Sequence, residues 1–184
     1  PVNGWRLSST AVPPIFGTNK INSTSDGQYG VFWNGDITQD PPTGIIDAEY
    51  IMLLDTAFDL SAFPSVNFEF QQFGALFVEK QVVEASIDGT TWVEIGNNTD
   101  MGMYTAAGGS AFPNPSNRSY NVTKAFPNGT VLSAVKFRFR VFWGANVPAS
   151  NKGIAYGWFV DDIKLTEGQP NDLRLANAFA IVGT

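Results

Sequence analysis

"VKFRFRVFW", residues 135–143, gives the clearest indication of the fold class. Its apolar side chains alternate with cationic ones every second residue, which is the period of a β-strand with one buried and one solvated face. The residues predicted to point inward are Val135, Phe137, Phe139 and Val141, and those predicted to point outward are Lys136, Arg138 and Arg140. The stretch therefore predicts a strand that covers an apolar core.

Similar patterns recur elsewhere in the chain. "VVEASIDGTTWVEI" (82–95) reads as a hairpin, because apolar residues approach an Asp88-Gly89 turn and others leave it. "SVNFEFQQFGALFV" (65–78) alternates at its start, and "EYIMLLDTAFDLS" (49–61) begins as an apolar strand. Gly and Pro, with 18 and 11 copies, interrupt the chain too often for long helices. Many short strands between turn-rich loops predict an all-β fold, an antiparallel β-sandwich.

The length of 184 residues fits one sandwich domain with a short appendage. Residues 97–119 and 144–157 are rich in small and turn-forming residues, and we expect both to be long loops. After Leu165, "EGQPND" has the composition of a linker, which places a boundary near Gly168. We expect residues 1–168 to form the domain. Residues 169–184 would be a linker with the start of a following domain, or a docked terminal strand.

The composition excludes several classes of function. Hydrophobic residues make up 43% of the chain and charged residues 15%, as in globular proteins. A net charge of −6 without a long basic run argues against nucleic-acid binding. No apolar run is long enough to predict membrane insertion. Cys and His are both absent, which excludes zinc sites built from thiolates or imidazoles and Ser-His-Asp or Cys-His catalysis.

"YGWFVDDIKL" (156–165) reads as a closing strand, yet it contains the adjacent carboxylates of Asp161 and Asp162. Because successive strand residues point to opposite faces, we expect one of the two carboxylates to face the core. A buried carboxylate costs several kcal/mol unless positive charge or hydrogen bonds compensate it. The pair therefore needs a partner.

The order of the motifs resembles the MAM-like jelly rolls, including the cleaved-adhesin and choice-of-anchor modules of secreted bacterial proteins. The matching stretches are "NGW" (3–5), "LLDTAFDLS" (53–61), "NFEFQQF" (67–73), "VEASIDGTTWVEI" (83–95), "VKFRFRVFW" (135–143) and "GWFVDDIKL" (157–165). The resemblance spans residues 3–167 and implies a jelly-roll sandwich in a secreted or cell-surface, extracellular protein. The absence of Cys favours the bacterial branch of this group, because animal MAM domains carry disulfides.

The resemblance also implies a structural calcium ion near the closing strand. Calcium takes six to eight oxygen ligands, and oxygen donors without His or Cys favour it over transition metals. The candidate metal ligands are Asp161, Asp162, Asp26, Asn34, Asp36, Asp40 and Asp47. The alternative is that the aspartate pair caps a turn, accepts backbone N–H bonds or pairs with Arg or Lys.

Aromatic side chains in or beside the expected loops are candidates for ligand contact, since exposed rings stack on sugars and partner surfaces. They are Trp33, Trp143, Tyr104, Phe112 and Tyr120. The alternative is that these rings close the ends of the sandwich. Glu69, Glu84 and Glu94 are the candidates for paired-carboxylate glycoside hydrolysis, but we expect them to be ordinary surface residues and the chain not to be an enzyme.

The sequence therefore predicts a non-catalytic, calcium-stabilised adhesion or binding module. It would belong to a larger secreted or cell-surface protein and bind glycan or protein beside neighbouring domains of the same polypeptide. One alternative is a carbohydrate-binding module of a polysaccharide-degrading enzyme. The other is a jelly-roll glycosidase or lyase.

Overall fold

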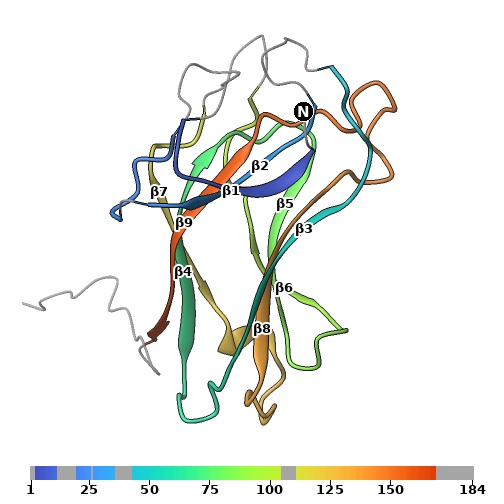
Figure 1. The fold of residues 1–184 in the computed structure, drawn as a ribbon. Helices are drawn as coiled ribbons and strands as arrows, with labels where there is room; N and C mark the ends of the chain where they lie inside the picture. The colour runs from blue at the N-terminus through green and yellow to red at the C-terminus, as the bar shows by residue number, and fades with distance from the viewer. Residues whose placement is uncertain (1–2, 12–19, 26, 36–42, 105–110, 169–184) are drawn as a thin grey trace, which may run out of the picture.

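A computed structural model describes residues 3–11, 20–25, 27–35, 43–104 and 111–168. Within these ranges the chain forms two antiparallel sheets that pack face to face (Figure 1). The elements are β1 (Gly4–Ser8), β2 (Tyr29–Trp33), β3 (Tyr50–Phe58), β4 (Val66–Gly74), β5 (Lys80–Ser86), β6 (Val93–Asn97), β7 (Ser116–Asn121), the short 3-10 helix η1 (Thr123–Ala125), β8 (Val135–Phe142) and β9 (Trp158–Glu167). The strand orders are β1-β2-β9-β4-β7 in the five-stranded sheet and β3-β8-β5-β6 in the four-stranded sheet. The predicted antiparallel β-sandwich is confirmed.

β8 has the burial pattern that its sequence predicts, with alternate residues buried along its whole length. It lies between β3 and β5, so its inward side chains sit in the middle of the four-stranded sheet. The predicted hairpin is formed by β5 and β6. Its turn is longer than the Asp88-Gly89 pair, because the Asp88 carboxylate also accepts the backbone N–H groups of Thr90 at 2.7 Å and Thr91 at 2.6 Å.

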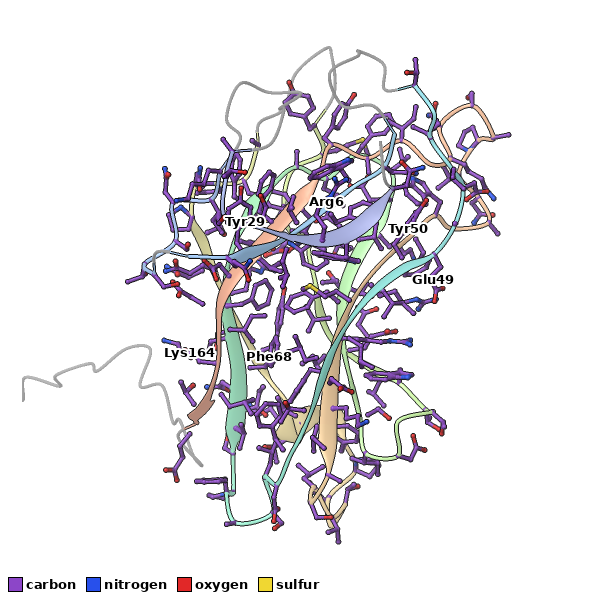
Figure 2. All side chains as sticks on the ribbon, in the orientation of Figure 1. Arg6, Tyr29, Glu49, Tyr50, Phe68 and Lys164 are labelled. Carbon is purple, nitrogen blue, oxygen red and sulfur yellow. The ribbon has the colours of Figure 1, made fainter. Side chains whose placement is uncertain are left out.

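Aromatic rings fill the space between the sheets. Phe68 of β4 stacks on Phe137 of β8 with ring centroids 4.6 Å apart, and Phe139 meets Trp158 of β9 edge-on at 5.4 Å. Figure 2 shows Phe68 pointing between the two layers. Truncating a core ring of this kind to Ala costs about 3–5 kcal/mol, so these contacts fix how the two sheets sit on each other.

A second apolar cluster covers part of the outer face of the five-stranded sheet. Its members come from outward positions of β2, β4 and β9 and from the segment before β2: Ile21, Tyr29, Val31, Trp33, Phe73 and Phe159. β2 is therefore buried on both faces, which explains why its sequence is a continuous apolar run. The outer face of β4 and β9 beyond Phe73 and Phe159 is left to polar side chains.

Two strands, β2 and β7, lie in stretches for which the sequence predicts no strand. β2 contains Trp33, which we expect from the sequence in or beside a loop, and β7 begins inside the predicted loop 97–119. β7 is a polar strand at the edge of its sheet, so it lacks the apolar alternation that marks a half-buried strand. The proposed boundary at Gly168 and the tail 169–184 lie at and beyond the end of the described residues. No helix in the described part of the chain has the length and apolar character needed to cross a membrane.

Candidate functional site

A β-bulge in β9 places both carboxylates of the aspartate pair outside the core. Gln71 of β4 lies opposite Asp161, and Glu69 lies opposite Lys164, so β9 advances by three residues where β4 advances by two. Asp162 has a φ of 51°, a left-handed conformation that Asp adopts more readily than most residues. The expectation that one carboxylate faces the core is therefore wrong, because the extra residue breaks the simple alternation of the strand.

The partners of the two carboxylates come from residues 20–25, called here the 20–25 segment. Asp162 Oδ2 accepts the backbone N–H groups of Thr24 at 2.8 Å and Ser25 at 3.2 Å. Asp161 Oδ2 accepts the hydroxyl of Ser23 at 2.5 Å. A hydrogen bond from the Ser25 side chain, supported by these N–H groups, lowers the pKa of the Asp162 carboxyl. Hydrogen bonds thus compensate the pair in the way that the alternative interpretation expects.

Further hydrogen bonds, from Gln71 and Asn114, hold the 20–25 segment in place. Gln71 accepts the N–H of Thr24 through Oε1 and donates to Thr24 Oγ1 through Nε2, both at 2.8 Å. Asn114 accepts the N–H of Asn22 at 2.8 Å and donates to the carbonyl of Lys20 at 3.0 Å. The segment is therefore held against the five-stranded sheet from β4, β9 and the connection before β7.

Next to this segment, the outer face of the five-stranded sheet is hollowed into an open groove of about 720 Å³. Thr24 and Ser25 line it on the side of the segment. Phe70, Arg118, Asp162 and Ile163 also border it. Its other lining side chains, on β4, β7 and β9, are Glu69, Gln71, Asn117, Ser119 and Lys164. Because alternate strand residues share a face, these side chains stand on the face opposite to the core residues Phe68 and Phe70. Figure 2 shows Lys164 and Phe68 on opposite sides of the sheet.

The charges in the groove compensate each other. Lys164 Nζ lies 3.3 Å from Glu69 Oε2, and the Ser119 hydroxyl lies 3.4 Å from Glu69 Oε1. The Lys164 side chain is 63% exposed and that of Glu69 is 26% exposed, so both remain open to a ligand. Gln71 Nε2 also donates to Asn117 Oδ1 at 3.2 Å, which leaves the Asn117 amide N–H groups directed elsewhere. The groove thus offers amide, hydroxyl and paired charged groups to solvent.

The candidate calcium ligands do not gather around the aspartate pair. The Asn34 amide is buried and bonds the Ile46 backbone and the Gly153 carbonyl. Asp47 pairs with Lys152 at 3.5 Å. Asp26, Asp36 and Asp40 lie outside the described residues. Within the described ranges no three Asp or Glu side chains are grouped so that they could hold a metal ion. Asp161 and Asp162 alone do not complete a calcium shell, and the calcium site stays a prediction.

Three of the five candidate aromatic residues belong to the packed interior. Trp33, Trp143 and Phe112 are 7%, 8% and 4% exposed, so their rings are not free to stack on a ligand. The Arg6 guanidinium covers the Trp33 ring, and the Trp143 indole donates to the Ile154 carbonyl at 3.1 Å. The expectation that these rings are exposed is wrong, because they close the sandwich as the alternative interpretation supposed.

The two tyrosine candidates are partly buried and lie away from the groove lining. The Tyr120 ring packs on Gly96 of β6, and its hydroxyl donates to the Asn97 carbonyl at 2.7 Å. Arg118 in turn donates to the Tyr120 hydroxyl at 2.9 Å, so Tyr120 joins β7 to β6. Tyr104 meets Tyr156 edge-on with ring centroids 4.9 Å apart.

The carboxylates considered for glycoside hydrolysis are separated by the sandwich. Glu69 faces the groove on the five-stranded sheet, whereas Glu84 lies on the outer face of the four-stranded sheet. Both Glu84 oxygens are held by arginines, with Oε2 2.6 Å from Arg138 Nε and Oε1 3.2 Å from Arg140 Nη1. Glu94, the neighbour of Glu84 across β5 and β6, is exposed and accepts the Asn97 amide. Glu69 and Glu84 cannot flank one glycosidic bond, since they face opposite sides of the molecule.

Sequence reasoning placed two of the groove side chains on the correct face of their strand, but it did not identify them as a site. Alternation in "NFEFQQF" (67–73) placed Glu69 and Gln71 on the solvent face, and the structure confirms this placement. It missed Asn117, Ser119 and Lys164 as site residues, because their position depends on the pairing of β4 with both β7 and β9. No local signal in a polar strand indicates which neighbour it will choose.

Comparison with known proteins gives similarity to solved structures only. No family model matches the chain, and no curated protein matches it. TmCBM61 in complex with beta-1,4-galactotriose is 16% identical over 89% of this chain and 88% of its own, with a TM-score of 0.44. A family 30 carbohydrate-binding module is 13% identical over 91% and 93%, with a TM-score of 0.47. A Stig cyclase from Fischerella sp. TAU is 12% identical over 88% and 73%, with a TM-score of 0.43. Likeness at this level assigns the chain neither a function nor a ligand.

Proposed function

We propose that the chain is a non-catalytic binding module that holds an uncharged glycan in the groove of the five-stranded sheet. The observation that carries this proposal is the groove itself, a hollow of about 720 Å³ lined by amide, hydroxyl and charge-paired side chains beside the apolar Ile163. Amide and hydroxyl groups both donate and accept hydrogen bonds, which matches the hydroxyl groups of a sugar. Strands hold these side chains, so little ordering is needed when the ligand binds.

The charge distribution favours an uncharged ligand. Glu69 and Lys164 neutralise each other within the groove, and Asp162 is satisfied by the 20–25 segment. The net charge of −6 repels polyanions at long range. An apolar peptide would leave the polar groups of the groove without partners, which costs about 1–3 kcal/mol for each buried group.

Binding in this groove would rest on hydrogen bonds to the sugar edges. None of the five candidate aromatic residues lines it. A net gain of about 0.5–1.5 kcal/mol for each hydrogen bond implies weak binding, with a dissociation constant on the order of 0.1–1 mM for a handful of bonds. Weak individual binding suits a module that acts beside neighbouring domains, because linked sites bind together more tightly.

The setting that we propose is a secreted or cell-surface protein. There the groove would bring neighbouring domains of the same polypeptide to a glycan, which serves adhesion and polysaccharide degradation alike. This setting follows from the resemblance of the sequence motifs and from the ligand class proposed for the groove.

Affinity electrophoresis tests the proposal. The probes are soluble uncharged polysaccharides, namely hydroxyethylcellulose, xylan, glucomannan and galactan, with polygalacturonic acid as the anionic comparison. We expect at least one uncharged polysaccharide to retard the wild type, and Asn117→Ala and Ser119→Ala to weaken that retardation about 10-fold together, the loss of about 1.4 kcal/mol. Lys136→Ala, on the outer face of the four-stranded sheet, is the matched control and should bind as the wild type does. Retardation that survives the groove variants, or is lost in the control, would contradict the proposal.

A further inference from the structure

A row of three buried amide side chains links the two sheets. Gln72 projects from β4 of the five-stranded sheet, Gln81 from β5 of the four-stranded sheet, and Asn98 follows β6. All three are at most 1% exposed. We call this set the amide row. Trp158 of β9 lies at one end of it and Glu79, just before β5, at the other.

The hydrogen bonds of the amide row fix the orientation of each amide, and Gln72 and Asn98 bond each other reciprocally, with Asn98 Nδ2 donating to Gln72 Oε1 at 3.0 Å. The Trp158 indole N–H, which can only donate, bonds Gln72 Oε1 at 2.8 Å. Gln72 Nε2 therefore faces Asn98 Oδ1 at 3.0 Å, and Asn98 Nδ2 faces Gln81 Oε1 at 2.8 Å. Gln81 Nε2 then donates to Glu79 Oε1 at 2.9 Å and to the Ala75 carbonyl at 3.0 Å. A fixed donor at one end thus sets the orientation of every amide up to the carboxyl group at the other.

The Glu79 carboxyl is itself buried, with 3% exposure. Its second oxygen, Oε2, accepts the Phe77 N–H at 3.0 Å. Burial raises the pKa of Glu79 to about 7, although backbone N–H bonds and the Gln81 bond act in the opposite direction. A cavity of about 70 Å³ adjoins it, and the other titratable side chains that line this cavity are Lys80 of β5 and Glu94 of β6. The other side chains of the hydrogen-bonded row, namely the three amides and the Trp158 indole, do not titrate.

The chain has no His and no Cys, so no side chain with an ordinary pKa competes with the Glu79 carboxyl in a titration near neutral pH. Side chains with an ordinary pKa between about 5.5 and about 8.5 are those of His and, at the upper limit, Cys. A titration in this range therefore reports a strongly shifted group or the amino terminus of the chain.

We propose that Glu79 and the amide row form a pH-responsive element that couples the junction of the two sheets to one buried proton. The ionised carboxylate fits the row, since each of its oxygens meets a donor. The neutral acid adds an O–H donor to a group whose bonded neighbours are donors. That proton can be accepted by water in the adjoining cavity, or by Gln81 if its amide turns over. Turning Gln81 breaks its bond to the Ala75 carbonyl and places its nitrogen against Asn98 Nδ2, so the change passes along the row to Trp158.

A pH titration of the full chain by NMR tests this proposal. We expect the indole N–H of Trp158 and the side-chain amides of the row to shift between about pH 5.5 and about 8.5 with one shared midpoint near 7. Glu79→Gln should remove that shared midpoint. Glu94→Gln, which changes the exposed carboxyl of the same cavity, should preserve it. A wild type without the transition, or a Glu79→Gln variant that keeps it, overturns the proposal.

A measurement on the wild type alone covers the case in which Glu79→Gln does not fold. The folded pKa of Glu79 lies above its unfolded value of 4.5, so its contribution to stability is complete below about pH 4.5 and is lost as the pH rises through about 7. Urea unfolding should therefore show a falling free energy of unfolding from about pH 5.5 to about 8. A flat profile over this range overturns the proposal.

Discussion

Asp162 Oδ2 lies 2.8 Å from the backbone nitrogen of Thr24 and joins β9 to the 20–25 segment. The two residues are 138 positions apart in the chain, and this bond helps to hold one side of the groove in place, together with the bonds from Gln71 and Asn114. It also accounts for an acidic pair in a strand, because the bulge that holds Asp162 turns its carboxylate toward donors instead of the core.

Removing this carboxylate should loosen the 20–25 segment. Asp162→Gly suits the φ of 51° and deletes the acceptor, whereas Asp162→Asn tolerates the same backbone conformation and retains one acceptor oxygen. We expect the amides of Thr24 and Ser25 to exchange about 5-fold faster in Asp162→Gly and close to the wild-type rate in Asp162→Asn, since each lost bond is worth about 1 kcal/mol. Hydrogen-exchange NMR measures both. Equal exchange rates in the wild type and in Asp162→Gly would contradict this prediction, because they would show that the bonds from Gln71 and Asn114 alone hold the 20–25 segment in place.

Calcium binding at the aspartate pair is a separate prediction from the sequence. A ligand that binds only the native state raises the melting temperature by mass action. We expect a higher melting temperature in millimolar calcium than in excess EDTA, and a smaller difference in Asp161→Asn, which loses one negative ligand. Differential scanning calorimetry of both proteins measures this. Identical melting curves with calcium and with EDTA would remove the ion from the description of the site.

Glu84 should contribute more to stability than a surface carboxylate does. It is 5% exposed and ion-paired with Arg138 and Arg140. Glu84→Gln removes the charge between two partly buried guanidinium groups, and we expect a loss of about 2–4 kcal/mol in the free energy of unfolding. Glu49→Gln removes an exposed partner of Arg140 and should cost less than about 1 kcal/mol. Urea unfolding measures the free energy of unfolding of both variants. Similar losses in Glu84→Gln and Glu49→Gln would contradict the prediction that Glu84 contributes more.

The contact between β6 and β7 predicts a sharp intolerance at Gly96. A Cβ at this position would overlap the Tyr120 ring, whose hydroxyl is already fixed to Asn97. We expect Gly96→Ala to destabilise the fold by about 1–3 kcal/mol through overpacking. Gly102, where a Cβ meets open space, provides the control, and Gly102→Ala should be near neutral. Thermal unfolding compares them, and a neutral Gly96→Ala would mean that the ring moves aside freely.

The sequence predicts the elements whose pattern is decided locally. Alternation identifies β8 and the first part of β4, and the Asp88-Gly89 signal identifies the β5–β6 hairpin. It fails at β7, a polar edge strand whose neighbour is chosen by the whole sheet. It also misplaces Trp33, because the outer apolar cluster that buries this ring forms from segments far apart in the chain. The groove could be predicted only in part. Its β4 side chains follow a local alternation, whereas the position of its β7 and β9 side chains depends on strand pairing.

Binding of an uncharged oligosaccharide to the groove can be observed directly by NMR on the ¹⁵N-labelled chain. The probes are cello-, xylo-, manno- and galacto-oligosaccharides, added in turn. We expect at least one of them to shift the side-chain amides of Gln71 and Asn117 together with the backbone amides of Asp162–Lys164, all of which line the groove. Shifts confined to the four-stranded sheet, or spectra unchanged by every one of these probes, would contradict the proposed function.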